Sequence, residues 1–144
     1  MPQKKTLQQL IELARLRSDN AARSLGVSRS QEEMASTKLK LLEDYREEYS
    51  ARFDRAVRTG LDRGAWENYD QFMVKLDAAF RHQQELLEQS RRRVEQCRSD
   101  WQAASGRVKS FDTLDQRRQR AERATEQRRE QREQDEFATR KSTR

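Results

Sequence analysis

Residues 59–64 read Thr59-Gly60-Leu61-Asp62-Arg63-Gly64, and this is the only segment of the chain with two glycines close together. Closely spaced glycines mark turns, because glycine adopts backbone conformations that other residues avoid. Asp62 has the side chain preferred at the start of a helix. The one proline is at position 2, and good helix formers (Gln, Glu, Arg, Ala and Leu) dominate on both sides. The segment therefore predicts a turn between two long helices.

A seven-residue repeat of mostly apolar residues precedes this turn. Alternate steps of four and three residues give Leu7, Ile11, Ala14, Ser18, Ala21, Leu25, Ser28, Glu32, Ala35, Leu39, Leu42, Arg46, Tyr49, Phe53 and Ala56. A second repeat follows the turn and gives Trp66, Tyr69, Met73, Leu76, Phe80, Gln83, Leu87, Ser90, Val94, Cys97, Trp101, Ala104, Val108 and Phe111, with an apolar end at Leu114. An apolar spacing of about 3.5 residues, sustained over many turns, is typical of a left-handed coiled coil.

The two stripes are almost equally long, so the simplest fold is a chain that doubles back on itself. We predict an all-α fold: a long antiparallel two-stranded coiled-coil hairpin with a protruding C-terminal helix, forming one domain over residues 1–144. The first helix is expected at 3–58, the turn at 59–64 and the second helix at 65–138, unpaired after about residue 114, with a disordered tail at 139–144. Facing residues should have numbers that sum to about 121 or 122, which places Phe53 near Tyr69 and Leu25 near Cys97.

Composition limits the functions that such a chain can have. Of 144 residues, 33% are hydrophobic and 39% are charged, which is too few apolar residues for a thick core. A thin hairpin has no pocket that excludes water, its one histidine, His82, has no nucleophile at a fixed spacing, and no glycine-rich phosphate loop is present. We therefore expect no enzymatic activity, no cofactor and no metal. The net charge of +6 favours acidic partners: an acidic protein ring, anionic lipid or nucleic acid.

Location follows from two further features of the sequence. No apolar run approaches the roughly 20 residues needed to cross a bilayer, and the polar start MPQKK leads into no apolar signal segment. The single cysteine, Cys97, offers no disulfide within the chain, which agrees with a reducing compartment. We expect a cytoplasmic protein.

Some large apolar residues lie beside the seam rather than in it. Tyr45 is one turn from Leu42 and Tyr49, and Phe72 and Ala79 flank the second stripe. By the pairing sum, one band across both helices near the turn contains Leu42, Tyr45, Tyr49, Phe72, Leu76 and Ala79. Exposed aromatic bands often mark protein contacts, although these residues could also widen the core.

The pattern changes after Leu114, because residues 115–136 contain no apolar side chain larger than alanine. Arg and Glu at a spacing of four residues still favour helix, and Phe137 is the one large apolar group near the end. An arginine-rich tail could bind RNA or DNA through phosphates. The acidic residues interleaved with the basic ones, and the lack of an aromatic platform, argue against nucleic acid.

Several of these residues resemble the FliJ family of flagellar export proteins. The resemblance covers nearly the whole chain and is carried by Trp66-Glu67-Asn68-Tyr69-Asp70-Gln71-Phe72 with Leu76 and Ala79, by Tyr45 and Tyr49, by Ala21-Ala22-Arg23 with Leu25-Gly26, and by Asp135-Glu136-Phe137-Ala138. Lys38 and Gln83, at the edges of the family's gate-binding positions, depart from it, since the family commonly has glutamine and histidine at those places.

The resemblance implies a non-enzymatic component of the flagellar type III export apparatus, cytoplasmic and peripheral at the inner-membrane face of the flagellar base. Its implied partners are the flagellar export ATPase hexamer, the cytoplasmic part of the export-gate membrane protein, and export chaperones. The band of six residues named above matches the gate-binding positions of the family. The basic open end would enter the ATPase ring, with contacts expected from Arg117, Arg118, Arg128, Arg129, Arg132 and Phe137.

Two other functions are compatible with the residues alone. The first is an adaptor or chaperone that holds export clients without touching an ATPase. The second is a nucleic-acid binder that uses the basic tail. Stimulation of the export ATPase separates the coupling function from the adaptor, and salt-sensitive binding of RNA or DNA identifies the nucleic-acid binder.

Overall fold

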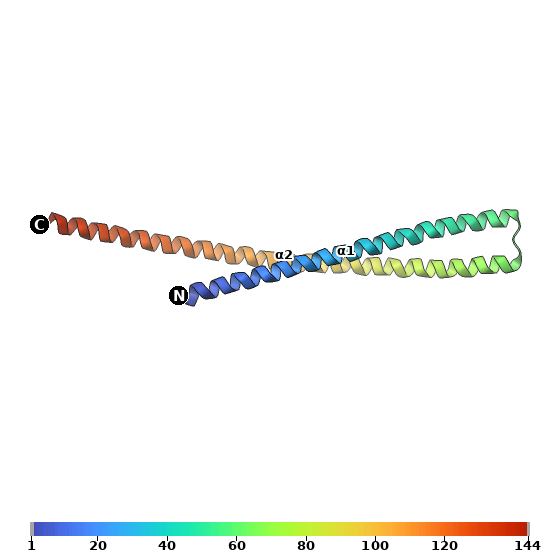
Figure 1. The fold of residues 1–144 in the computed structure, drawn as a ribbon, viewed down its shortest axis with the longest axis horizontal. Coiled ribbons are helices and arrows are strands. Elements are labelled where there is room, and N and C mark those ends of the chain that lie inside the picture. Colours follow the sequence, from blue (N-terminus) through green and yellow to red (C-terminus); the bar gives the residue numbers. More distant parts are fainter. Residues whose placement is uncertain (1, 144) are drawn as a thin grey trace. The chain divides into compact units, whose positions relative to one another are not determined.

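The computed structural model describes the backbone of residues 2–143 and the side chains of residues 6–143. It contains two helices, α1 (Pro2–Thr59) and α2 (Arg63–Ser142), which pack against each other as an antiparallel hairpin (Figure 1). No strand occurs among these residues. The predicted all-α helical hairpin is confirmed.

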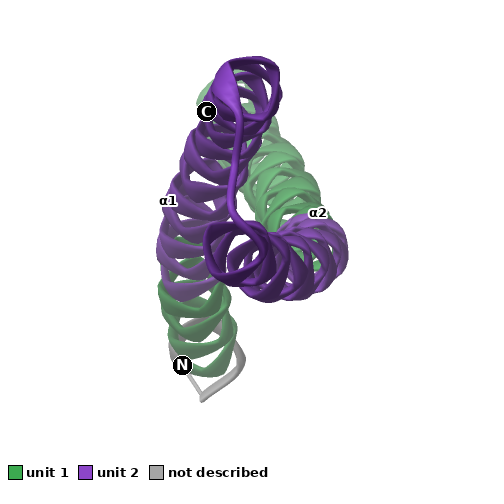
Figure 2. Ribbon diagram, turned by 90° about the vertical axis from the view of Figure 1, so that its right-hand side faces the viewer, with its two compact units in different colours: residues 1–19, 102–144 green, residues 20–101 purple. Residues whose placement is uncertain are grey.

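The hairpin divides into two compact units, each built from parts of both helices (Figure 2). Unit 2 spans residues 20–101 and contains the turn, whereas unit 1 combines residues 1–19 with residues 102–144. Unit 2 has 15 Lys and Arg and 15 Asp and Glu, while unit 1 has 16 Lys and Arg and 10 Asp and Glu. The whole net charge of +6 therefore belongs to unit 1.

The turn is three residues long, because both helices extend further than the sequence predicts. Gly60 has a φ of 94°, a left-handed conformation in which glycine carries no steric penalty, and its N–H donates to the Val57 carbonyl at 3.3 Å. The Asp62 carboxylate accepts a hydrogen bond from the Ala65 N–H at 2.7 Å, which caps α2. The predicted turn at 59–64 is therefore too long: this cap places Arg63 in the first turn of α2, so only residues 60–62 lie outside the helices.

The seam of α1 follows the heptad repeat at every position. In residues 6–59, the fifteen heptad positions from Leu7 to Ala56 are buried or half-buried, and every other residue is exposed. Ile11, Ala14, Leu25, Ser28 and Ala35 are the most deeply buried. A single narrow stripe of this kind is the packing of a two-stranded coiled coil.

Polar residues within the seam of unit 2 find partners inside it. Ser28 is 2% exposed and donates its hydroxyl hydrogen to the Leu25 carbonyl at 2.8 Å, next to the buried cluster of Leu25, Val94 and Cys97. Gln83 donates from Nε2 to the Ala35 carbonyl across the seam at 3.1 Å. Since buried polar groups cost free energy only when they lack partners, these residues are compatible with a tight seam.

The second stripe differs from the prediction at its two tryptophans and its end. Trp66 and Trp101 lie at seam spacing but keep 47% and 36% of their surface exposed, because an indole ring is too large to be covered by one neighbouring helix. Leu114 is half exposed, so the predicted apolar end of the stripe is wrong. The heptad continues instead through Asp115 and Arg118, which are both half-buried.

In unit 1 the packed region ends at Arg118. Ile11 and Ala14 are buried there, and Arg15 Nη2 lies 3.4 Å from Asp112 Oδ1. Arg118 Nη2 lies 2.9 Å from Asp115 Oδ1, with 21% and 17% of the two side chains exposed. All residues from 119 to 143 are exposed. The packing of α2 thus extends one turn beyond the predicted limit at residue 114, because Asp115 and Arg118 occupy the next two heptad positions and are both half-buried.

The helix itself continues to Ser142, so residues 139–142 of the predicted disordered tail are helical. Hydroxyl groups reinforce its last turns: Thr139 donates to the Asp135 carbonyl at 2.8 Å, and Thr143 donates to the Thr139 carbonyl at 3.1 Å. Arg140 and Lys141 lie in the last turn, where positive charge favours the carbonyl end of the helix dipole. Neither α1 nor α2, over the part of the chain described, contains a stretch apolar enough to span a membrane.

Candidate protein-interaction surfaces

Four aromatic rings meet across the seam close to the turn. The Tyr49 ring centroid lies 4.3 Å from that of Phe72 and 5.2 Å from that of Tyr69, and Phe53 lies 5.5 Å from Tyr69. The tilted and edge-on arrangements are those that aromatic rings prefer. The Tyr49–Phe72 and Phe53–Tyr69 pairs have residue numbers that sum to 121 and 122, as predicted, whereas Tyr49–Tyr69 sums to 118 and is a diagonal contact about one turn away.

The six residues of the predicted gate-binding band occupy different depths. Leu76 is buried at 7% exposure, and Leu42 and Tyr49 are half-buried. Tyr45 and Phe72 are 55% and 40% exposed, and Ala79 is exposed as well. Of the six residues, Tyr45, Phe72 and Ala79 are exposed, and the other three lie beneath or between them as packed support.

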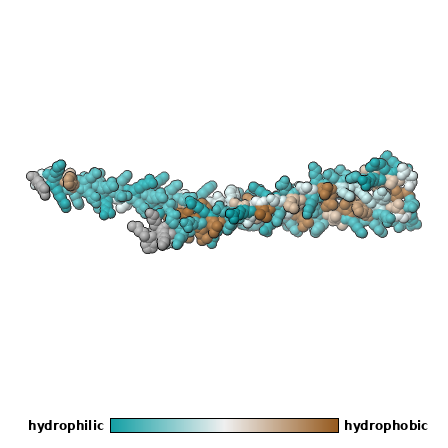
Figure 3. Space-filling view, viewed as in Figure 1, coloured by the Kyte–Doolittle hydropathy of each residue, from teal (hydrophilic) through white to brown (hydrophobic). Residues whose placement is uncertain are grey.

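Sequence reasoning missed a row of exposed apolar residues beside this band. Met34 and Leu41 on α1 are 61% and 63% exposed, and Leu86 on α2 is 37% exposed. Their spacing was the available signal, because Met34 and Leu41 are seven residues apart and Leu86 follows Phe72 and Ala79 at the same interval. Hydrophobic residues lie along the whole paired part of the hairpin, whereas the C-terminal part of α2 is almost entirely hydrophilic (Figure 3).

An arginine in the seam of unit 2 is held by two partners. Arg46 Nε lies 2.7 Å from Asp77 Oδ1, and its guanidinium carbon lies 5.1 Å from the centroid of the Phe80 ring. The carboxylate neutralises the charge and the ring face attracts the cation, so this residue fits among apolar neighbours. Arg46 thus fixes the register directly beside Leu42 and Tyr49.

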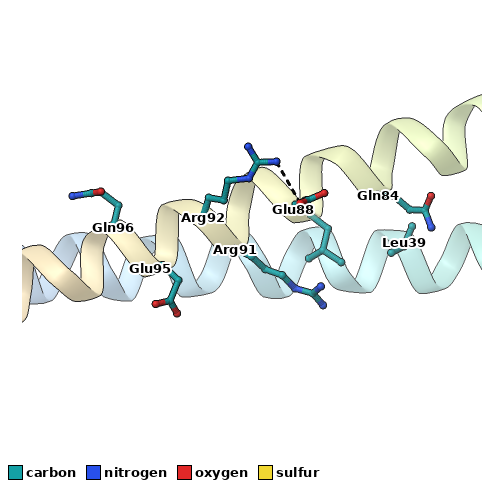
Figure 4. A pocket seen from close by; sticks show the side chains of 8 residues that line it. Leu39, Gln84, Glu88, Arg91, Arg92, Glu95 and Gln96 are labelled. Carbon is teal, nitrogen blue, oxygen red and sulfur yellow. Dashed lines mark ion pairs between the residues drawn. The ribbon is translucent and has the colours of Figure 1, made fainter.

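A groove with a volume of about 730 Å³ runs along one side of the seam, the side that carries Arg91 (Figure 4). Leu39 of α1 and Leu87 of α2 form its base. Its arginines are already paired: Arg91 Nε lies 3.7 Å from Glu32 Oε1, and Arg92 Nη2 lies 3.4 Å from Glu88 Oε1. The arginines of this groove are therefore neutralised by glutamates within the chain.

The predicted ring-binding residues of unit 1 lie on a helix without a neighbour. Arg118 pairs with Asp115, and Arg118 Nη1 and Arg129 Nε lie 3.8 Å from Glu122 and Glu133 respectively. Arg117, Arg128 and Arg132 are exposed and form no ion pair within the described residues. At 3.6 residues per turn these last three point to within about 60° of one another.

Opposite charge occupies the other side of the same helix. Glu122, Glu126, Glu130 and Glu133 recur at three or four residues and face away from the three unpaired arginines. Phe137, also predicted to contact the ring, is 69% exposed beyond them. The helix therefore presents Arg117, Arg128 and Arg132 on one exposed face, and Asp135 lies on the same face near the C-terminal end. The described residues contain no group of three or more side chains that could hold a metal ion.

Comparison with known proteins identifies the family of this chain. The family described as "Flagellar FliJ protein" matches residues 3–144. The chain belongs to the FliJ family. Proteins named flagellar FliJ protein from Salmonella typhi and Escherichia coli (strain K12) are 33% and 31% identical to it. The alignments cover 100% and 94% of this chain, and 98% and 92% of the two relatives.

Membership in the FliJ family makes this chain a component of flagellar protein export and of flagellum assembly. The match spans both helices and both compact units. The resemblance inferred from the residues around the turn is confirmed at the level of the family. The individual partners of the aromatic band and the arginine face stay predictions.

Proposed function

We propose that this FliJ-family chain is a non-enzymatic coupling element between the flagellar export ATPase and the export gate. Its unit 1 binds inside the ATPase hexamer, and the exposed aromatic band of unit 2 binds the cytoplasmic part of the export-gate membrane protein. It also escorts export chaperones. The chain acts on the cytoplasmic side of the inner membrane and reaches the membrane only through these partners.

One observation carries the proposal: the chain separates two kinds of binding surface between its units. Unit 2 has no net charge and presents Tyr45 and Phe72 on an aromatic support, which suits a contact driven by apolar burial. Unit 1 holds the net charge of +6 and presents unpaired arginines, which suits an acidic ring lining. A coupling element needs two such surfaces that do not compete for the same partner.

Coupling requires no chemistry from the chain. His82, the one histidine, is exposed, and the groove of Figure 4 holds arginines and glutamates that neutralise each other. Catalytic sites instead combine a concave, water-excluding pocket with titratable groups in perturbed environments. The proposal therefore assigns this chain a mechanical or conformational role.

The decisive experiment measures ATP hydrolysis by the purified export ATPase with the intact chain added. We expect stimulation by the wild type and its loss in the variant Arg117→Gln/Arg128→Gln/Arg132→Gln. A matched control, Arg23→Gln/Arg29→Gln/Lys40→Gln, removes three exposed cations from unit 2 and should stimulate normally. Equal stimulation by both variants would show that Arg117, Arg128 and Arg132 do not contact the ATPase.

A second measurement addresses the gate. Phe72→Ala should weaken binding of the purified cytoplasmic part of the export gate, whereas Val57→Ala, which shortens another half-exposed apolar residue, should leave it unchanged. Gate binding without any ATPase stimulation by the wild type would favour the adaptor function over coupling.

A further inference from the structure

An open groove of about 370 Å³ lies between α1 and α2 in unit 2, on the flank of the seam away from Arg91. Met34 and Leu86 are its exposed apolar walls, and Ala35 lies at its base. Lys38 and Arg93 are the charged residues that line it, and the remaining lining is uncharged: Gln31, Gln83, Gln89 and Ser90. Lys38 and Gln83 fall at the edge of the gate patch that the family resemblance implies, whereas that resemblance assigns nothing to Met34, Leu86 or Arg93.

The apolar walls are unusual for a two-stranded coiled coil. Two helices need apolar residues only at the two seam positions of each heptad. Met34 and Leu41 lie outside the seam on α1, and Leu86 lies outside it on α2. An apolar face that is broader than the seam is the pattern of a helix in a bundle, where a further helix covers the additional residues.

The two cations of the groove are available to a ligand. Neither Lys38 nor Arg93 forms an ion pair within the described residues, and no carboxylate lines the groove. The groove on the other flank differs, because Arg91 and Arg92 there are paired with Glu32 and Glu88. Of the two grooves, only the one with apolar walls has positive charge that nothing in the described chain neutralises.

The spacing of the cations defines the ligand further. In the observed register Lys38 lies level with residue 83 or 84, so Arg93 is about ten residues away along the hairpin, or about 15 Å at 1.5 Å per residue. Met34 and Leu86 lie between them. A helix of about three turns spans this distance.

We propose that this groove binds an amphipathic helix of a partner protein, which packs as a third helix on unit 2. The ligand helix carries apolar residues on one face and two carboxylates about ten residues apart. Its apolar face covers Met34, Leu86 and the neighbouring Leu41, and its carboxylates pair with Lys38 and Arg93. This surface adjoins the proposed gate band, but it recognises its ligand through Met34, Leu86 and the two cations rather than through the aromatic residues. The proposal therefore goes beyond the proposed function.

A synthetic helical peptide tests the proposal with the full chain. The probe has leucines on one face and two glutamates ten residues apart, and its control has lysines in place of the glutamates. We expect the glutamate peptide to bind and the lysine peptide to bind at least about tenfold more weakly, as two pairs at the edge of an interface would give. Isothermal titration at two salt concentrations measures both, and the difference should shrink at high salt.

Charge reversal in the protein completes the test. The variant Lys38→Glu/Arg93→Glu should bind the glutamate peptide more weakly and the lysine peptide more tightly than the wild type does. The matched control Lys40→Glu/Arg81→Glu changes two exposed cations outside the groove and should leave the preference unchanged. Met34→Ser/Leu86→Ser should weaken both peptides. Equal affinity for the two peptides, or no exchange of preference on charge reversal, would overturn the proposal.

The proposed gate contact can fail independently. Phe72→Ala removes a gate residue that does not line the groove, so peptide binding should persist in that variant. If Phe72→Ala leaves gate binding intact while the peptide preference reverses as expected, the gate assignment is wrong and the groove assignment stands. If Phe72→Ala weakens gate binding while charge reversal leaves the peptide preference unchanged, the groove assignment is wrong and the gate assignment stands.

Discussion

The two tyrosines of the aromatic band should respond differently to truncation, although they are one turn apart on α1. Tyr49 is half-buried and its ring packs on Tyr69 and Phe72 at 5.2 and 4.3 Å. Tyr45 is 55% exposed and makes no ring contact within the described residues. We therefore expect Tyr49→Ala to destabilise the hairpin and Tyr45→Ala to affect chiefly binding.

The size of the difference follows from the contacts. Two aromatic pairs at about 0.5–1.5 kcal/mol each give a loss of about 1–3 kcal/mol in the free energy of unfolding for Tyr49→Ala, before lost apolar burial is added. Tyr45→Ala should change that free energy by about 0.5 kcal/mol or less, as exposed substitutions do. If Tyr45 is a central gate contact, its loss should cost about 2 kcal/mol of binding, or about 30-fold in Kd.

Urea unfolding followed by far-UV circular dichroism gives the stabilities, and calorimetric titration with the cytoplasmic part of the export gate gives the affinities. Tyr49→Phe keeps both ring contacts and serves as the control for stability. Equal destabilisation by Tyr45→Ala and Tyr49→Ala would show that Tyr45 packs against the hairpin and is not part of the exposed surface. An unchanged gate affinity in Tyr45→Ala would refute its assignment as a contact.

Three further changes test the hairpin itself. Leu25→Cys should form a disulfide with Cys97 inside one molecule under mild oxidation, seen as a faster band on a non-reducing gel; dimers alone would contradict the register. Asp62→Ala should lower the free energy of unfolding by about 1 kcal/mol through loss of the cap on α2, with Asp62→Asn as the conservative control and an unchanged urea midpoint as the contrary result. Asp115→Ala leaves the half-buried Arg118 without its nearer carboxylate and should cost about 1–2 kcal/mol, and wild-type stability in that variant would show that the pair is dispensable.

The seam was predictable because burial in a two-stranded coiled coil depends on spacing alone. Every heptad position of α1 from Leu7 onward is buried or half-buried, including the polar Ser28. The glycine at position 60 and the cap at Asp62 likewise gave the place of the turn. These features are local or strictly periodic, so their physical cause is visible in the order of residues.

The ends of the packed region were less predictable. Asp115 and Arg118 read as the start of a solvated tail, but they pair with each other at 2.9 Å and continue the seam. A charged residue can take a buried heptad position only when its partner is beside it, and a search for apolar residues overlooks such pairs. The helical turns at 139–142 were missed because propensity gives little guidance at chain ends.

The sequence by itself determined that this chain is a helical hairpin of the FliJ family, which side of each helix faces the other, and where the chain reverses. Only the tertiary structure decided which apolar residues stay uncovered, and so which of them a partner can reach. The heptad spacing places Tyr45, Met34 and Leu86 beside the seam, but only the packed helices show that 55%, 61% and 37% of their surfaces stay uncovered. Exposure depends on what lies opposite each side chain, and that is fixed only when the two helices are in register.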